Sequence, residues 1–368
     1  MSVPPLGGLG GKRASQGAPD GAVAASGAPG GGGTPAPDSL DFRLLNDFQR
    51  DFPLCAAPYA ELATRLGVVE NEVLKALEGL KRAGKISRVG AVFAPKRIGA
   101  STLAAVAVPP ERLAAVAEIV NRFPEVNHNY EREHRYNLWF VATAGSEGRL
   151  ASALAAIESA VGLPVLRLPL LAEYHIDLGF GLGAPGALGG SEESAPAMPR
   201  APAAQPFVPP RTLDEGERRL VMALQEGLPL FIRPFALLAE RIGSDEAAVI
   251  ARIRQWVDEG IIKRFGVVVR HHELGYTANA MLVHDLPDAA ADALGERLAR
   301  EPAVTLCYRR PRVLPDWPYN LFCMIHGQDR ATVEATIADL RGRLGLEGYA
   351  HAVLFSRTRY KQTGARYV

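Results

Sequence analysis

The sequence predicts an α+β protein made of two similar units, each a winged helix-turn-helix followed by a ferredoxin-like βαββαβ domain. Two observations predict the duplication. PLCAAPYAELATRLG (53–67) returns as PLFIRPFALLAERIG (229–243), and KISRVGAVFAPKRIG (85–99) returns as IKRFGVVVRHHELG (262–275), at an offset of 176 residues. Self-similarity of this length indicates a tandem duplication. A duplicated domain normally packs as an internal pseudo-dimer, which is the architecture we expect.

The first part of each unit has the pattern of a winged helix-turn-helix. In copy one, DFRLLNDFQRDF (41–52) carries apolar residues close to helical spacing. YAELATRLG (59–67) ends in a glycine cap, and VVENEVLKALEGLKRAG (68–84) is a second helix that closes on a glycine. KISRVGAVF then has strand character and forms the wing. Copy two repeats the pattern from Glu217 to Val269.

The second part of each unit alternates strands and helices in the order β-α-β-β-α-β. Copy one reads TLAAVAV, PERLAAVAEIVNRF, VNHNYER, YNLWFVATAG, GRLASALAAIESAVG and, as one last strand, VLRLPLLAEY. Copy two reads ANAMLVHDL, DAAADALGERLAR, VTLCYRR, YNLFCMIHG, ATVEATIADLRGRLG and HAVLFSRTRY. This order is typical of a ferredoxin-like sandwich.

Two stretches rich in Gly, Ala and Pro separate these parts, and neither can bury enough apolar surface to order itself. The predicted organisation is a disordered tail (1–38), copy one of the winged helix-turn-helix (39–99) and of the ferredoxin-like domain (100–180), a disordered linker (181–211), and copy two of the same domains (212–275 and 276–368).

Bulk composition excludes several classes of protein. Among 368 residues, 48% are hydrophobic and 22% charged, as in globular proteins, and the net charge of +1 creates no field toward nucleic acid or membrane. No apolar run is long enough to span a bilayer, and residues 1–38 lack the apolar region of a secretory signal. The three cysteines, at unrelated positions, offer neither a disulfide framework nor a metal-ligand spacing. We therefore expect a cytoplasmic protein.

The unit resembles the AsnC/Lrp family of regulators, whose first helix opens like DFRLLNDFQ and ERRLVMALQ. Two longer strings narrow the resemblance. NHNYEREHRYNLWF (127–140) and CYRRPRVLPDWPYNLFCMIHG (307–327) resemble the two subunits of sirohaem (also written siroheme) decarboxylase, an enzyme family built on the regulator fold. One chain with both subunits resembles the fused form of haem d1 biosynthesis.

The resemblance implies that the chain removes two acetate carboxyl groups from sirohaem, giving 12,18-didecarboxysirohaem, without a cofactor. The family also serves the alternative haem pathway. Two other functions stay open from the residues alone. One is an AsnC/Lrp-type regulator that senses a small ligand, and the other is a non-catalytic tetrapyrrole-binding protein.

One hairpin, NHNYEREHRYN (127–137), is the strongest candidate for a site. His128, Tyr130, Arg132, His134 and Tyr136 alternate with the strand period, which predicts that they share one face. That face is too polar for a core, so it is either a ligand site or a solvated surface. The implied substrate bears eight carboxylates, which arginine forks match. Decarboxylation also needs a proton donor, commonly His or Tyr.

Copy two complements this hairpin. Leu306 replaces His128, whereas RHH at 270–272 replaces APK at 94–96. We expect the two sets of histidines to line one pocket from different units. The catalytic candidates are His128, His134, His271 and Tyr130. The substrate-binding candidates are Arg132, Arg135, Tyr136, Asn137, Arg270, His272, Tyr308, Arg310, Trp317, Tyr319 and Asn320. A histidine is also a suitable ligand for the substrate iron, and which one donates the proton stays open.

The helix-turn-helix motifs are poorly suited to DNA. Each recognition helix begins with carboxylates, Glu70 and Glu72 in copy one, Asp245 and Glu246 in copy two. Acidic first turns suit a helix but repel a polyanion whose binding depends on phosphate neutralisation. The motifs are therefore predicted to be structural, in an internal pseudo-dimer that is compatible with a further homo-oligomer.

This charge pattern predicts no sequence-specific duplex binding at about 150 mM salt, where specific binders reach nanomolar affinity. Fluorescence anisotropy with the duplex upstream of the chain's own gene, against a scrambled duplex, checks it. A nanomolar, sequence-selective signal would contradict the prediction.

Overall fold

The computed structural model describes residues 35–36, 38–94, 97–176, 211–270 and 278–367. The predicted tail and linker lie outside the described residues, apart from 35, 36, 38 and 211 at their edges. The candidates His271 and His272 also lie outside them. Within the described part, no helix has the length and apolar character needed to cross a membrane.

Both helix-turn-helix motifs form as the sequence predicts, and glycine and proline set their limits. Prolines begin α2 and α7, where the missing N–H is harmless. Gly67 and Gly243 end these helices with φ of 70°, a conformation that favours glycine. The elements of copy one are α1 (Leu40–Asp47), α2 (Pro58–Leu66), α3 (Glu70–Arg82) and the wing β1 (Ile86–Phe93). Those of copy two are α6 (Glu215–Glu226), α7 (Pro234–Ile242), α8 (Glu246–Asp258) and the wing β7 (Ile262–Val269).

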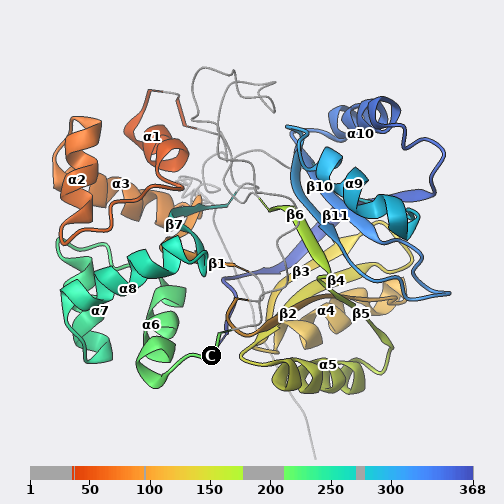
Figure 1. Ribbon diagram of the computed structural model, residues 1–368, viewed down its shortest axis with the longest axis horizontal. Coiled ribbons are helices and arrows are strands. Elements are labelled where there is room, and N and C mark those ends of the chain that lie inside the picture. Colours follow the sequence, from red (N-terminus) through yellow and green to blue (C-terminus); the bar gives the residue numbers. More distant parts are fainter. Residues whose placement is uncertain (1–34, 37, 95–96, 177–210, 271–277, 368) are drawn as a thin grey trace, which may run out of the picture. The chain divides into compact units, whose positions relative to one another are not determined.

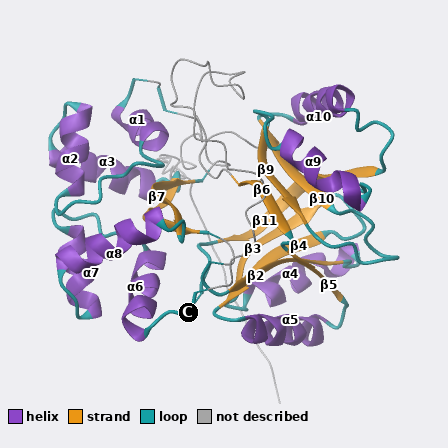
Figure 2. Cartoon of the chain, in the orientation of Figure 1, coloured by secondary structure: helices purple, strands orange, loops and turns teal. Residues whose placement is uncertain are grey.

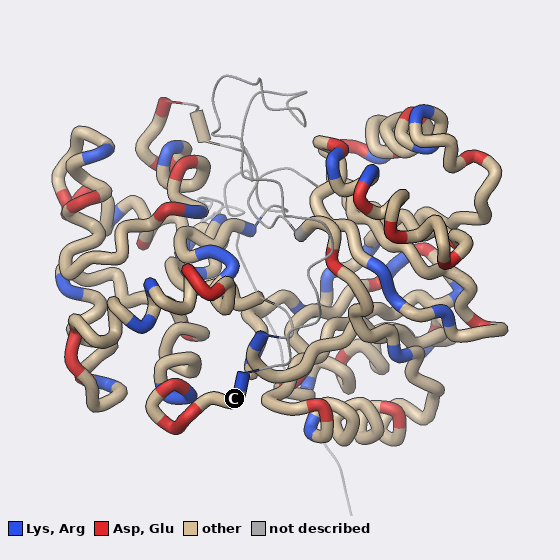
Figure 3. The backbone as a smooth tube through the Cα atoms, viewed as in Figure 1, with Lys and Arg blue, Asp and Glu red and all other residues tan. Residues whose placement is uncertain are grey.

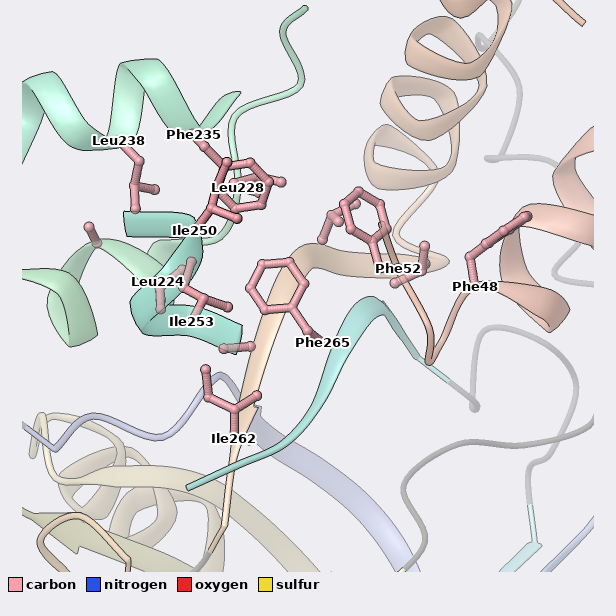
Figure 4. Packing of buried hydrophobic residues seen from close by; sticks show 14 of the residues in the cluster. Phe48, Phe52, Leu224, Leu228, Phe235, Leu238, Ile250, Ile253, Ile262 and Phe265 are labelled. Atoms are coloured by element: carbon pink, nitrogen blue, oxygen red, sulfur yellow. The ribbon is translucent and has the colours of Figure 1, made fainter. Parts of the chain in front are cut away.

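The two motifs share one hydrophobic core. Their wings pair antiparallel, and the equivalent glycines Gly90 and Gly266 face each other in the register. Around this pair, Phe52 of copy one lies against Phe265 of copy two, with ring centroids 5.9 Å apart, and Phe265 also meets Phe235 (Figure 4). Buried residues from all six helices belong to the same cluster. The motifs are therefore halves of one folded body.

The ferredoxin-like parts form a second two-copy assembly. Nine strands of the described chain make one sheet in the order β5-β2-β4-β3-β11-β8-β10-β9-β6. In Figures 1 and 2 helices α4 and α5 lie beside the strands of copy one, and α9 and α10 beside those of copy two. Copy one contributes β2 (Ala100–Val106), α4 (Leu113–Asn121), β3 (Val126–Arg132), β4 (Leu138–Ala144), α5 (Glu147–Val161), β5 (Val165–Pro169) and β6 (Ala172–Ile176). Copy two contributes β8 (Ala278–His284), α9 (Asp288–Leu298), β9 (Val304–Arg309), β10 (Leu321–Gly327), α10 (Arg330–Leu344) and β11 (His351–Gln362).

The copies exchange their last strands. The first half of β11 pairs with β8 of its own copy, and the second half pairs with β3 of copy one. In the same way β5 pairs with β2, whereas β6 pairs with β9 of copy two. The sequence predicts one last strand in copy one, and that prediction is wrong. Pro169 has no N–H for a ladder, so β5 ends there and the chain resumes as β6.

A third core forms where the copies meet. It combines Leu103, Trp139 and Leu168 of copy one with Met281, Trp317 and other residues of copy two. The helices of the ferredoxin-like parts instead cover two separate cores, α4 and α5 that of copy one and α9 and α10 that of copy two. The internal pseudo-dimer predicted from the duplication is thereby confirmed.

The hairpin β9–β10 brings two of the three cysteines together. All three are free thiols, but Cys307 and Cys323 lie opposite each other with their sulfurs 3.4 Å apart. Residues far apart in the sequence meet because the two strands pair. Copy one has Asn129 and Phe140 at these places, so the fold does not require the thiol pair.

The close packing around Gly266 of the wing β7 predicts that a single added methyl group lowers stability. A Cβ at Gly266 would lie 2.4 Å from the Phe48 carbonyl oxygen, which is backbone and unable to yield. Gly266→Ala is expected to lower the free energy of unfolding by about 2 kcal/mol or more. Gly79→Ala is the control, because its Cβ meets nothing within 4 Å inside α3, and alanine there adds about 0.5–1 kcal/mol. Urea denaturation measures both; equal stability of the variants would contradict the packing at the wings.

Candidate functional site

Three of the predicted side chains share one face of β3. The His128 and Tyr130 rings lie 6.1 Å apart between centroids, and the Arg132 guanidinium carbon is 5.9 Å from the Tyr130 centroid. Asn129 turns the other way, donating from its amide to the Ala117 carbonyl of α4 at 3.2 Å. The alternation along β3 therefore separates a functional face from a face packed against a helix.

The predicted single face does not continue through His134 and Tyr136, so this prediction is wrong. The chain turns after Arg132, where the His134 N–H donates to the Arg132 carbonyl at 3.0 Å and the Arg132 N–H to Asn137 at 2.8 Å. The turn ends the alternation. His134 and Tyr136 therefore belong to a second group.

Strand β11 brings cations from copy two to the face of β3. Arg359 is paired with Tyr130, and Gln362 with His128. Arg270, just after the wing β7, joins Arg359 and Gln362 in lining an opening of about 100 Å³ with Tyr360 and Lys361. This volume is smaller than that of a pocket for a whole ligand, so the opening fits a carboxylate arm and not a whole macrocycle.

Two equivalent arginines reach from one copy to the other. Arg132 donates from Nη1 to the Leu354 carbonyl at 3.0 Å, and Arg310 donates to the Leu168 carbonyl. Arg132 is 7% exposed, and burial lowers its pKa to about 10 and lowers the pKa of Arg310 as well. Among the described residues neither guanidinium meets a carboxylate. Buried cations without an anion are strongly unfavourable, so this region attracts a negative ligand.

Tyr308 and His326 complete the polar region around these arginines. Tyr308 lies under Arg310, 4.6 Å from guanidinium carbon to ring centroid. The His326 ring nitrogens lie 3.0 Å from the Thr305 hydroxyl and 2.9 Å from the Asn279 amide. Burial, then the Arg132 charge, lowers the pKa of His326 to about 4. Burial also lowers the pKa of the half-buried His128 to about 4. Both imidazoles are therefore neutral at pH 7 in the free protein.

The second group is a cluster of rings from both copies. His134 and Trp317 lie 5.4 Å apart between ring centroids, and Tyr136 and Trp317 lie 6.1 Å apart. Tyr319 also packs against Trp317, at 5.0 Å. The Tyr136 N–H donates to Nδ1 of His134 at 3.0 Å, which places the imidazole proton on Nε2. The structure thus joins predicted residues of copy one to Trp317 and Tyr319 of copy two.

Several predicted side chains have partners within the fold. The amides of Asn137 and Asn320 each exchange two hydrogen bonds with one backbone residue, Val108 and Leu286 respectively. We assign both asparagines a structural role. Arg135 is exposed and pairs with Asp316 at 3.3 Å.

The basic run near Trp317 is also largely neutralised. Arg309 pairs with Asp288 and Asp292, and Arg312 with Asp285 and Asp288, at 2.7–3.2 Å. Of this run, Arg310 alone is turned inward without an acidic partner among the described residues.

The copies are unequal at one pair of equivalent positions. In copy one, the Asn127 amide donates to the Thr143 hydroxyl. The C-terminal segment joins this pair: the Thr363 N–H donates to the Asn127 carbonyl, and the Thr143 hydroxyl donates to the Arg366 carbonyl. In copy two, Thr305 and His326 take these places. The histidine therefore distinguishes the copy-two side of the interior.

Three contributors are not among the candidates predicted from the sequence: Arg359, Lys361 and His326. The first two lie in RTRYKQ (357–362), where cations alternate, and that signal was available. Lys361, however, turns toward α4 and donates to the Asn121 carbonyl at 2.7 Å. His326 lies at a strand end, where the sequence favours a structural or surface role, and its importance comes from Arg132 on a distant strand.

Comparison with known proteins follows the same division into parts. The AsnC-like ligand binding domain matches residues 97–175 and 273–361, and the siroheme decarboxylase NirDL-like HTH domain matches residues 41–86 and 217–263. The chain is 45% identical over 328 residues to the siroheme decarboxylase NirDL subunit of Paracoccus denitrificans, covering 89% of this chain and 97% of the relative. The chain belongs to the sirohaem decarboxylase family.

Other relatives agree with this membership. The siroheme decarboxylase of Hydrogenobacter thermophilus is 29% identical over 88% of this chain and 94% of its own. A crystal structure of the siroheme decarboxylase NirDL matches with a TM-score of 0.65 at 26% identity, over 89% of this chain and 94% of that one. A NirDL structure in co-complex with an iron-uroporphyrin III analogue matches with a TM-score of 0.64 at 25% identity, over 89% and 93%. The resemblance drawn from the sequence is confirmed.

The burial of His128 predicts an acid-dependent loss of stability. The unfolded chain binds a proton at this residue near pH 6.5, whereas the folded chain resists until about pH 4. The folded state therefore loses stability as pH falls through this window. His128→Leu, which places the residue of copy two in copy one, should make the fall in Tm between pH 7.5 and 5 smaller by several degrees. Differential scanning calorimetry checks it, and identical pH profiles for the two proteins would contradict the burial.

Proposed function

We propose that the chain is a carboxy-lyase that removes two acetate carboxyl groups from sirohaem to give 12,18-didecarboxysirohaem, in haem d1 or alternative haem biosynthesis. One observation carries the proposal. Arg132, which is buried, and Arg310, which is half-buried, lie where the copies meet and face no carboxylate among the described residues. A substrate with eight carboxylates supplies the missing anions. Membership of the sirohaem decarboxylase family supports the same assignment.

The cations of the site divide by exposure into two tasks. Arg359 is exposed and Arg270 half-buried at the opening beside β3, where they meet carboxylate arms without much loss of hydration. Arg132 and Arg310 are deeper, where a carboxylate is desolvated and each hydrogen bond is stronger. We propose that the outer pair collects the substrate and the inner pair orients it.

Decarboxylation breaks the bond between the acetate methylene and its carboxylate. CO₂ leaves, and the electron pair of that bond passes to the methylene carbon, stabilised by the conjugated macrocycle of the substrate. A proton then forms the new C–H bond, so each acetate becomes a methyl group. The protein therefore has to place the carboxylate, exclude water and deliver one proton for each CO₂ released.

The neutral histidines suit proton delivery once the substrate is bound. His128 has its pKa held near 4 by burial, and the charge of a bound polyanion shifts it upward. Substrate binding thus favours protonation of His128, and this proton is the one that the reaction consumes. His134 holds a proton on Nε2 beside Trp317 and is the second candidate donor. Tyr130, with its pKa raised by burial, is a weaker acid than either imidazolium.

Two further expectations belong to this proposal. We propose that no cofactor is added, because the macrocycle itself accepts the electrons. We also propose a cytoplasmic location, since the three cysteines are free thiols, which suits a reducing compartment.

Anaerobic incubation of the purified chain with sirohaem, followed by product mass, tests the proposal. Loss of two CO₂ per molecule supports it. An absorbance change with unchanged mass indicates a tetrapyrrole-binding protein instead, and no change in either contradicts any action on sirohaem.

The division of tasks predicts separate effects of substitution. His128→Ala or His134→Ala should lower kcat about a hundredfold, the scale of losing a general acid. Arg359→Ala, at an exposed residue, should raise KM at least several-fold with kcat nearly kept, because it removes a carboxylate contact. Arg132→Ala and Arg310→Ala should weaken binding more strongly.

The matched control is Arg122→Ala, an exposed arginine of copy one that pairs with Glu118 far along α4. It should leave both constants unchanged. Steady-state kinetics and thermal melts of each variant separate lost binding from lost folding. Wild-type rates in both histidine variants would remove β3 and its turn from the chemistry.

A further inference from the structure

An exposed apolar surface distinguishes the helix-turn-helix of copy two. Met222, Phe231 and Ile232 are each 53% exposed, and Leu237 is 38% exposed. These four residues, which we call the α6–α7 patch, lie on α6, on the loop that follows it and on the first turns of α7. About half of four large side chains is on the order of 300–400 Å² of apolar surface, comparable with the largest patch of an ordinary monomer, which is often functional.

The duplication supplies an internal comparison. At the offset of 176 residues the four equivalents in copy one are Asn46, Cys55, Ala56 and Glu61. The buried positions between them keep their chemistry; Leu62 and Leu238, for example, are both in the shared core. The fold therefore does not need apolar residues on this surface. Their presence in copy two alone indicates a contact made by copy two.

The four side chains of the patch lie on two neighbouring helices and on the loop that joins them. Ile232 and Leu237 flank the start of α7 at the positions that form a hydrophobic staple. The staple accounts for their proximity but leaves much of both side chains in solvent. Met222 lies one helical turn before Glu226, which pairs with Arg241, itself one turn after Leu237. The ion pair therefore links α6 and α7 next to the side chains of the patch that these helices carry.

The charges at its edge are already paired within the chain. Arg241 pairs with Glu226, and Arg233 pairs with Glu246 through two contacts. Figure 3 shows acidic and basic residues interspersed along these helices, without a band of one sign. An edge of paired charges neither repels an identical surface nor selects a strongly charged partner.

The patch also continues from an interface that exists inside the chain. The Tyr59 hydroxyl of copy one donates to the Pro229 carbonyl at 3.0 Å, and Arg254 of copy two donates to the Leu54 carbonyl at 2.5 Å. The loop that carries Phe231 and Ile232 is thus held against copy one on one side, while its apolar side chains project outward.

We propose that the α6–α7 patch binds the same patch of a second copy of this chain, forming a two-fold dimer. An isologous contact buries the patch twice. With its edge it reaches the lower end of specific interfaces, roughly 1,200 Å² in total. The dimer is therefore weak and reversible, with dissociation at micromolar concentrations. This inference is independent of the reaction proposed above.

Sedimentation equilibrium of the full chain from about 1 to 200 μM tests the proposal. The average mass should rise from the 39.4 kDa of the monomer toward twice that value. The four changes Met222→Asn, Phe231→Ala, Ile232→Ala and Leu237→Glu together should weaken association at least tenfold. Three of them introduce the copy-one residue, and alanine stands in for Cys55 at Phe231. Met222→Asn and Leu237→Glu are also made singly, so that a folding defect of the fourfold variant leaves the test intact.

The matched controls are Val69→Ala and Leu314→Ala, which shorten apolar side chains that are 63% and 70% exposed outside the patch. They should associate like the wild type. A wild-type chain that stays monomeric at 200 μM overturns the proposal, and so does a dimer that the single patch variants leave unchanged.

Discussion

The exchange of last strands between the copies is the constraint on which the rest of the structure depends. Because β11 pairs first with β8 and then with β3, and β6 leaves copy one to pair with β9, neither copy completes its own sheet edges. Edges that would otherwise be open are covered by the other copy. The wings repeat this interdependence through β1 and β7. Because the two copies are parts of one chain, the effective concentration of each copy near the other stays high.

This exchange also creates the electrostatic character of the interior. Strand β11 carries Leu354 and Arg359 to the neighbourhood of β3, so Arg132 donates across copies and Tyr130 faces an added cation. Burial of guanidinium groups without acids would be unfavourable in a protein that never bound an anion. A polyanionic substrate pairs with these guanidinium groups, so the unfavourable burial contributes to binding affinity. Its negative charge also raises the pKa of the neutral imidazoles, which can then take up the proton that the reaction needs.

Most of the fold could be predicted from the sequence, because the duplication made each weak pattern visible twice. The helix-turn-helix motifs, wings and strand order followed from glycine caps and periodicity. The site was predicted less completely. His128, Tyr130 and Arg132 share a face because strand alternation is local, whereas His134 was misplaced by a turn. Arg359 and His326 depend on which strands become neighbours, and periodicity within one segment holds no information on that pairing.

A crystal structure of this chain with the iron-uroporphyrin III analogue tests the central claim, that both copies build one anion site, most directly. The account predicts carboxylates of the analogue within hydrogen-bond distance of Arg359 and of Arg132 or Arg310, with the His128 ring against the ligand. An analogue bound by residues of one copy alone, away from β3 and β11, would contradict it.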